Sequence, residues 1–222
     1  NEMPDFAGLQ EVTNRQLTYL SESLMNYDYI GVGRDDGKTK GEYSPIFYNN
    51  SKYKVVFENT FWLSPTPNTI SIGWDASMER ICTYGLFKNI ETQQKIWVFN
   101  THFDHRGNQA RKKSTDLISE IIKSKNGDNY PVILTGDFNL EDESLSIKKI
   151  QNQMKDVLIG FNKSNKYYGT YNGFQIENIN EKRIDYIFTK DLIQLKAEHI
   201  HLKTPYKGWA SDHHPVLAIL KL

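Results

Sequence analysis

Acidic, amide and imidazole side chains follow or precede several apolar runs in this sequence. Asp137 and Asn139 come just after a run of Val, Ile and Leu, Glu11 closes an earlier run, and Asp212 and His213 precede a third. A strand end is a rigid support for such polar groups. Carboxylate and amide oxygens suit Mg²⁺ or Mn²⁺ better than softer metals. These residue types predict metal-assisted hydrolysis of a phosphoester.

The same residue types suggest separate roles. Glu11 and Asp137 are the strongest candidates for carboxylates beside a divalent cation, and Asp212 is a third. His213 is the candidate general base, because a histidine can take a proton from water near neutral pH. A buried carboxylate would orient its ring, and Asp185, within a mostly apolar segment, is the candidate for that acid.

Hydrophobic periodicity predicts the elements that position these residues. Within residues 95–103 a period of two puts Trp97 and Phe99 on one face and Ile96 and Val98 on the other, so both faces should be covered. Many strands, hairpin connections and few helices favour two packed sheets with helices outside them. The expected strands are 6–12, 27–33, 45–48 in a hairpin with 53–57, 80–87 in a hairpin with 95–103, one from 131, 183–188, 192–202 and 215–220, and the expected helices begin after Thr13 or Asn14 and span 108–123 and 144–150.

Composition narrows the class of protein. The 222 residues contain 27 basic and 27 acidic side chains, and this net charge of zero argues against gripping long nucleic acid through an overall field. A single cysteine, Cys82, excludes an intramolecular disulfide and a thiolate zinc cluster. No apolar run is long enough to span a membrane. We therefore expect a soluble protein, secreted, periplasmic or cytoplasmic, with no protein partner implied.

Five short segments, in chain order, resemble those of the endonuclease/exonuclease/phosphatase superfamily. They are Leu9-Gln10-Glu11, Asn100-Thr101-His102, Gly136-Asp137-Phe138-Asn139, Ile184-Asp185-Tyr186 and Ser211-Asp212-His213-His214-Pro215-Val216. The resemblance covers nearly the whole chain and looks like an uncharacterised, largely bacterial branch. It implies a DNase I-like four-layer α/β sandwich, with two packed, mostly antiparallel sheets flanked by helices, in one domain over residues 1–222.

The resemblance also implies a role for each matched residue. One or two Mg²⁺ (or Mn²⁺) ions would be held by Glu11, with Asp212 near or on the metal, and His213 would be the base, held by Asp185. Asp137 and Asn139 would position the nucleophile, the leaving group or the phosphate. His102 is a further catalytic candidate, at the position where the family places a phosphate-contacting His or Tyr. The expected substrate contacts are Asn100, Arg106 and Arg111.

The start of the chain departs from the family pattern. Members of the superfamily begin with a strand that carries an Asn ligand on the metal side, and a helix leads from it into the Glu-bearing strand. Here the sequence opens only a few residues before that strand, and neither Asn1 nor Asn14 fits the missing position. We therefore expect the chain to be an N-terminally truncated form of the domain.

Three alternatives to a phosphatase or phosphodiesterase acting on a small phosphorylated substrate remain open. The same site could serve an endonuclease or exonuclease on DNA or RNA. The pattern Asn100-x-His102-x-Asp104-His105 nearly matches the zinc motif of metallo-β-lactamase-like hydrolases, apart from the Asn at its first position. The third alternative is a binding domain that has lost its activity.

Overall fold

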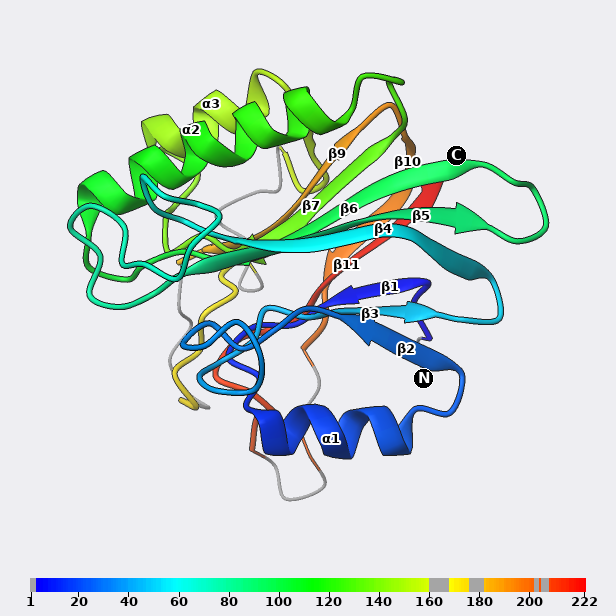
Figure 1. Cartoon of the computed structure of the whole chain (residues 1–222), viewed down its shortest axis with the longest axis horizontal. Coiled ribbons are helices and arrows are strands. Elements are labelled where there is room, and N and C mark those ends of the chain that lie inside the picture. Colours follow the sequence, from blue (N-terminus) through cyan, green and yellow to red (C-terminus); the bar gives the residue numbers. More distant parts are fainter. Residues whose placement is uncertain (1–2, 160–167, 176–181, 202–203, 205–207) are drawn as a thin grey trace.

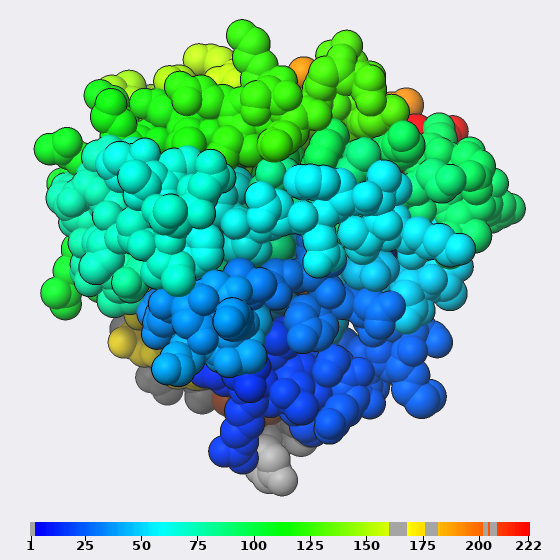
Figure 2. All heavy atoms as spheres, in the orientation of Figure 1, coloured from blue at the N-terminus to red at the C-terminus, as the bar shows by residue number. Residues whose placement is uncertain are grey.

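The chain folds into four layers, with helices outside two layers of strands (Figure 1). The computed structural model describes residues 3–159, 168–175, 182–201, 204 and 208–222. One outer layer holds α2 (Asn108–Lys125) and α3 (Leu145–Gln151), and the opposite one holds α1 (Asn14–Ser23). The space-filling view shows α2 in green and the N-terminal residues in blue at opposite ends of the molecule (Figure 2). The predicted four-layer sandwich is confirmed.

A six-stranded sheet forms the layer under α2 and α3. Its strands lie in the order β4-β5-β6-β7-β9-β8, and β6 and β7 are the parallel pair among antiparallel neighbours. Parallel neighbours need a long connection, which α2 supplies. The strands are β4 (Tyr53–Trp62), β5 (Ile81–Asn89), β6 (Lys95–His102), β7 (Val132–Asp137), β8 (Lys155–Asp156) and β9 (Asp185–Lys190).

Two small antiparallel sheets form the other layer of strands. One has the order β1-β3-β2, and the other pairs β10 with β11. Their bounds are β1 (Phe6–Gly8), β2 (Tyr27–Ile30), β3 (Ile46–Asn49), β10 (Ile193–His199) and β11 (Val216–Lys221). Facing edges of β1 and β11 border a groove of about 770 Å³, whose lining also includes Asp185 and His213. The groove thus adjoins predicted site residues.

Apolar side chains fill the spaces between the layers. Trp97 and Phe99 of β6 pack with Ile118 of α2, whereas Ile96 and Val98 on the other face pack toward the small sheets. A third cluster around Leu17 lies beneath α1. The expectation that both faces of the 95–103 strand are covered is therefore confirmed. Close packing on both faces fixes the position of β6, which ends at His102.

The predicted hairpin of residues 45–57 is wrong. Strand β3 pairs with β1 and β2, whereas β4 pairs with β5, so the turn after Asn49 carries the chain from one layer of strands to the other. Periodicity identifies a strand but not its partner. The first strand is also shorter than expected, because it ends at Gly8 and Glu11 lies beyond it.

Candidate active site

Three of the predicted site residues lie at neighbouring strand ends. Asp137 is the last residue of β7 and Asp185 the first of β9, and the antiparallel register sets them opposite each other. His102, the last residue of β6, is paired with Asp137 in the parallel register. Because the register fixes the Cα positions, the side chains of two carboxylates and one imidazole share one corner of the sheet.

His213 joins this corner from the turn before β11. Its Nδ1 lies 2.8 Å from Oδ2 of Asp185, as the orienting role predicted for Asp185 requires. Burial alone would lower the pKa of His213, but the hydrogen bond and charge of Asp185, with the charges of Asp137 and Asp212, raise it to about 9. In the metal-free protein His213 is therefore largely an imidazolium at neutral pH.

The turn that carries His213 is fastened by the segment from Tyr168 to Gln175. Tyr171 forms a β-bridge with His213, and the two rings lie 5.2 Å apart edge to face. The backbone N–H of Asn172 donates to the carbonyl of Asp212 at 2.7 Å, and its side-chain amide donates to the carbonyl of Ser211. Neither Tyr171 nor Asn172 was expected, because nothing in their local sequence marks them as neighbours of a turn 40 residues away.

Asn139 links the C-terminal end of β7 to the residue that follows β6. Its backbone N–H donates to Oδ1 of Asp137 at 2.8 Å, and its Nδ2 donates to the carbonyl of Phe103 at 3.0 Å. The Nε2 atom of His102 lies 3.4 Å from Oδ2 of Asp137. Asn139 adopts a left-handed conformation with φ of 49°, which suits asparagine better than most residues.

Glu11 reaches the cluster from outside any strand. Its φ of 57° is unusual for a glutamate, and its Oε1 lies 3.9 Å from Nε2 of His102. Burial and the charges of Glu42 and Asp212 raise its pKa, while His213 and Arg80 act in the opposite direction. The carboxylate of Asp212 thus contributes to the raised pKa of Glu11, and their role as metal ligands stays a prediction.

The donor set fits a divalent cation. Ligand atoms of Asp137, Asp185 and His213 lie within 4.8 Å of one another, and this is the group of three such residues found within the described part of the chain. Burial and the charge of Asp185 raise the pKa of Asp137 to about 7, with a further contribution from Glu11. A cation would relieve this repulsion between carboxylates. Glu11 and Asp212, the predicted ligands, stand beside this group, not within it.

Asn100 lies inside the protein, away from any surface that a substrate could reach. It is fully buried, and its Nδ2 donates to the carbonyls of Leu9 and Pro45 at 2.7 and 3.0 Å. Its Oδ1 accepts from Gln10 Nε2 and Thr135 Oγ1. These bonds join the two layers of strands just before Glu11. Asn100 thus supports the site from inside the protein, and its buried amide does not face a substrate.

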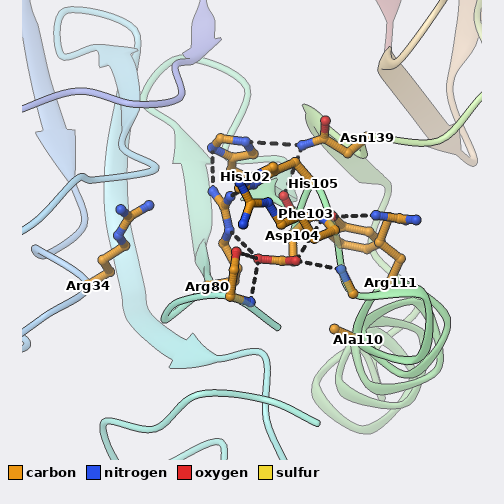
Figure 3. A network of polar contacts seen from close by, with 12 residues as sticks. Arg34, Arg80, His102, Phe103, Asp104, His105, Ala110, Arg111 and Asn139 are labelled. Atoms are coloured by element: carbon orange, nitrogen blue, oxygen red, sulfur yellow. Dashed lines mark hydrogen bonds and ion pairs between the residues drawn. The ribbon is translucent and has the colours of Figure 1, made fainter. Parts of the chain in front are cut away.

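Arg106 and Arg111 are not brought to the cluster. The Arg106 side chain is exposed, and its backbone N–H donates to Asp104 Oδ1. The Arg111 guanidinium donates to the carbonyl of Asp104 and to Asn108, at the start of α2. Figure 3 shows Arg111 on the side of Asp104 away from His102. Their role as phosphate contacts stays a prediction.

The groups of the zinc-like pattern are engaged with other partners. The Nδ1 atoms of His102 and His105 both face the guanidinium of Arg80, at 3.1 Å each. Asp104 accepts hydrogen bonds from the backbone N–H groups of Ser77, Arg106 and Gly107. A cationic guanidinium between the two rings is incompatible with a zinc ion bound through the same atoms.

These features define a four-layer α/β protein with a His–carboxylate pair beside a cluster of acids, and the chain belongs to the Endonuclease/Exonuclease/phosphatase family. The family model matches residues 1–213. An uncharacterised protein, L388, from Acanthamoeba polyphaga mimivirus is 29% identical over 237 residues, covering 99% of this chain and 87% of that protein. Membership supports phosphoester hydrolysis as the class of reaction.

Solved structures support the same assignment. Mannosyl-6-phosphatase Bt3783 of Bacteroides thetaiotaomicron VPI-5482 is 38% identical with a TM-score of 0.88, covering 98% of this chain and 85% of that one. A functionally unknown conserved protein from Enterococcus faecalis V583 has 28% identity, a TM-score of 0.86 and the same coverage. Humanized D. rerio TDP2, 20% identical with a TM-score of 0.79 over 99% of this chain and 86% of that one, shares the fold. Among the described residues, every helix is too short or too polar to cross a membrane.

Proposed function

We propose that this protein is a divalent-cation-dependent phosphatase that hydrolyses small phosphorylated sugars. The observation that carries the proposal is the His213–Asp185 pair, held at 2.8 Å beside the buried carboxylate of Asp137. A base oriented by an acid next to a cluster of hard oxygen ligands suits attack of water on a phosphoester. The similarity to mannosyl-6-phosphatase Bt3783 over nearly the whole chain favours a sugar phosphate as substrate.

Each residue has a defined part in this reaction. Asp185 holds the ring of His213 through Nδ1, which leaves Nε2 to take the proton of the attacking water. Glu11 and Asp212, with Asp137 beside them, would hold Mg²⁺ or Mn²⁺, and Asn139 would orient the phosphate. The cation, when bound, supplies positive charge that stabilises the phosphoryl oxygens in the transition state. With that positive charge nearby, the carboxylates would raise the pKa of His213 less, and its Nε2 could accept a proton near pH 7.

A substrate panel tests the proposal. The wild-type protein is assayed for phosphate release from mannose 6-phosphate, glucose 6-phosphate, nucleotides and phospholipids, and for cleavage of RNA and of single-stranded and duplex DNA. Each assay is run with Mg²⁺, with Mn²⁺ and with EDTA. We expect turnover of a sugar phosphate that EDTA abolishes and that His213→Ala lowers at least ~10²-fold. The control variant His201→Ala, at a histidine outside the pair, should keep the wild-type rate.

Other outcomes of the panel would indicate a different function for this protein. Cleavage of DNA or RNA, with an affinity that falls steeply as salt rises, would replace the phosphatase with a nuclease. Turnover that depends on zinc would favour the metallo-hydrolase alternative. No turnover of any substrate with either cation would contradict the proposal and favour an inactive binding domain. Wild-type turnover in His213→Ala would show that His213 is not the base.

A further inference from the structure

Arg80 is a buried cation that the sequence did not single out. It lies just before β5, is 5% exposed, and contacts the last residue of β6 and two residues that follow this strand. Its Nη1 lies 3.1 Å from Nδ1 of His102, its Nη2 lies 3.1 Å from Nδ1 of His105, and its Nε lies 3.5 Å from Oδ2 of Asp104. Figure 3 shows the guanidinium between the two imidazoles and the carboxylate. The Arg80 guanidinium thus faces the Nδ1 atoms of both imidazoles.

Hydrogen-bond chemistry allows one arrangement of protons here. A guanidinium only donates and stays protonated in proteins, so the Nδ1 atom of His102 must accept and carries no proton. A neutral imidazole has one N–H, which then lies on Nε2. Because Nδ1 accepts from Arg80, the ring holds a single proton and is neutral.

The Nε2 atom of His102 points into the acidic cluster. It lies 3.4 Å from Oδ2 of Asp137 and 3.9 Å from Oε1 of Glu11. Asn139 Nδ2 is 3.3 Å away, but its protons have acceptors in the carbonyl of Phe103 at 3.0 Å and Asp137 Oδ2 at 3.4 Å. The N–H of His102 thus points toward the carboxylates that the proposed function places beside the cation.

Asp104 fixes the guanidinium in turn. Its carboxylate is 2% exposed and accepts from the Ser77 hydroxyl at 2.7 Å and from the backbone N–H groups of Ser77, Arg106 and Gly107. Burial alone would raise the pKa of Asp104, but these hydrogen bonds hold it well below its usual range. Asp104 therefore remains charged beside Arg80, and the arginine cannot turn toward solvent without leaving that charge unpaired.

We propose that Arg80 is a positioning residue that fixes His102 as the neutral tautomer with its proton on Nε2, so that His102 donates a hydrogen bond to a phosphoryl oxygen. The last part rests on the proposed function, whereas the tautomer does not. A purely structural Arg80 would stabilise the fold through Asp104 and would have no effect on the position of the imidazole proton. The two roles therefore differ in a measurable way.

Two-bond ¹⁵N–¹H correlation spectra of the imidazole rings at pH 7 report the tautomer directly, without turnover. Signals of His102 are assigned by their loss in His102→Gln. We expect an unprotonated Nδ1 and a protonated Nε2 in the wild type, a mixture of tautomers in Arg80→Met, and wild-type signals in the control His105→Gln. A wild-type His102 that carries its proton on Nδ1, or a folded Arg80→Met with unchanged His102 signals, would overturn the proposal.

Inorganic phosphate with Mg²⁺ tests the donor role. We expect phosphate to move the His102 Nε2–H signal in the wild type and to move it much less in Arg80→Met. If Arg80→Met does not fold, Arg80→Lys replaces it, because lysine keeps the charge beside Asp104 but cannot span both rings. Phosphate that moves the His213 signals and leaves those of His102 in place would overturn the donor role. In Arg80→Met, kcat in the substrate panel should fall between ~10-fold and ~10⁴-fold. If the wild type turns over no substrate in that panel, the proposed function fails but the tautomer result still stands.

Discussion

The Nδ1 atom of His213 and the Oδ2 atom of Asp185 lie 2.8 Å apart at the start of β9. This hydrogen bond, with the charge of Asp185, is the largest influence that raises the pKa of His213 to about 9. In Asp185→Asn the charge is gone, and burial lowers the pKa instead. We expect His213 in the metal-free variant to titrate at a clearly lower pH than in the wild type, as measured by NMR, and turnover to fall by about 10²–10⁴-fold.

The control for this variant is Asp191→Asn, an exposed acid in the turn after β9. Its left-handed φ of 58° also suits asparagine, so the substitution should disturb nothing. Wild-type turnover and an unchanged His213 titration are expected there. If His213 still titrates near pH 9 in Asp185→Asn, the pair does not determine the state of the base.

The carboxyl group of Asp137 should make the metal-free protein less stable as the pH rises. Burial and Asp185 raise its folded-state pKa from the ordinary 3.8 to about 7. The folded protein therefore binds this proton more tightly than the unfolded chain, and the stability that the proton provides is present below pH 4 and lost between pH 4 and pH 7. Asp137→Asn cannot lose such a proton. We expect the advantage of the variant over the wild type in the free energy of unfolding to grow from near zero at pH 4 to about 1–4 kcal/mol at pH 8.

Urea unfolding in EDTA at a series of pH values measures this difference, with Asp128→Asn, an exposed acid after α2, as the control. Adding Mg²⁺ at pH 8 should stabilise the wild type and have little effect on Asp137→Asn. The variant lacks one of the carboxylates that would bind the cation, so its affinity for Mg²⁺ should be lower. Parallel pH profiles for wild type and variant would show that Asp137 is not held protonated.

Local signals in the sequence were enough to predict the elements and most of the acids of the site. Thr13 caps α1 through a capping box with Gln16, and Ser144 caps α3, as their residue types indicate. Asp137, Asp185 and His213 were predicted from acids and an imidazole at the ends of apolar segments, together with the family resemblance of their motifs. Their convergence depends on the register of β7 and β9, which the resemblance supplied and periodicity could not.

The features that the sequence did not reveal are contacts between residues far apart in the chain. Arg80 before a strand looks like an ordinary solvated charge, and only the fold encloses it with His102 and Asp104. Asn100 was expected to be a substrate contact from the resemblance of its motif, yet its amide donates to Leu9 and Pro45 between the layers. Both residues are defined by partners on distant elements, and single-sequence patterns carry no information on such partners.

Asn100 should be essential for stability. Its amide joins Leu9, Gln10, Pro45 and Thr135 in a region without solvent, so Asn100→Asp replaces two N–H donors with a carboxylate facing two carbonyl oxygens. We expect a loss of about 3–5 kcal/mol in the free energy of unfolding. Urea denaturation at pH 7 measures it, with the exposed Asn68→Asp as control. A loss below about 1 kcal/mol would mean that these bonds do not hold the layers together.

Arg183 and Asp156 form an ion pair inside the protein, next to the start of β9. Their side chains are 2% and 0% exposed, the guanidinium lies 4.5 Å over the ring of Tyr186, and Asp156 also accepts from Leu158 N–H at 3.0 Å. Removing one partner leaves the other charge buried, so Arg183→Met or Asp156→Asn alone should cost about 3–5 kcal/mol. Because Asp185 follows two residues after Arg183, we also expect each single variant to lower turnover.

A double-mutant cycle isolates the contribution of the pair. The variant with both substitutions has no unpaired charge, so its loss in unfolding free energy should be smaller than the sum of the single losses by about 2 kcal/mol or more. The surface pair Lys149–Asp116, with atoms 2.6 Å apart and the lysine side chain 52% exposed, is the matched control. Its coupling should stay within about 1 kcal/mol, because solvent screens it. Equal coupling energies in the two cycles would show that burial adds nothing to the Arg183–Asp156 pair.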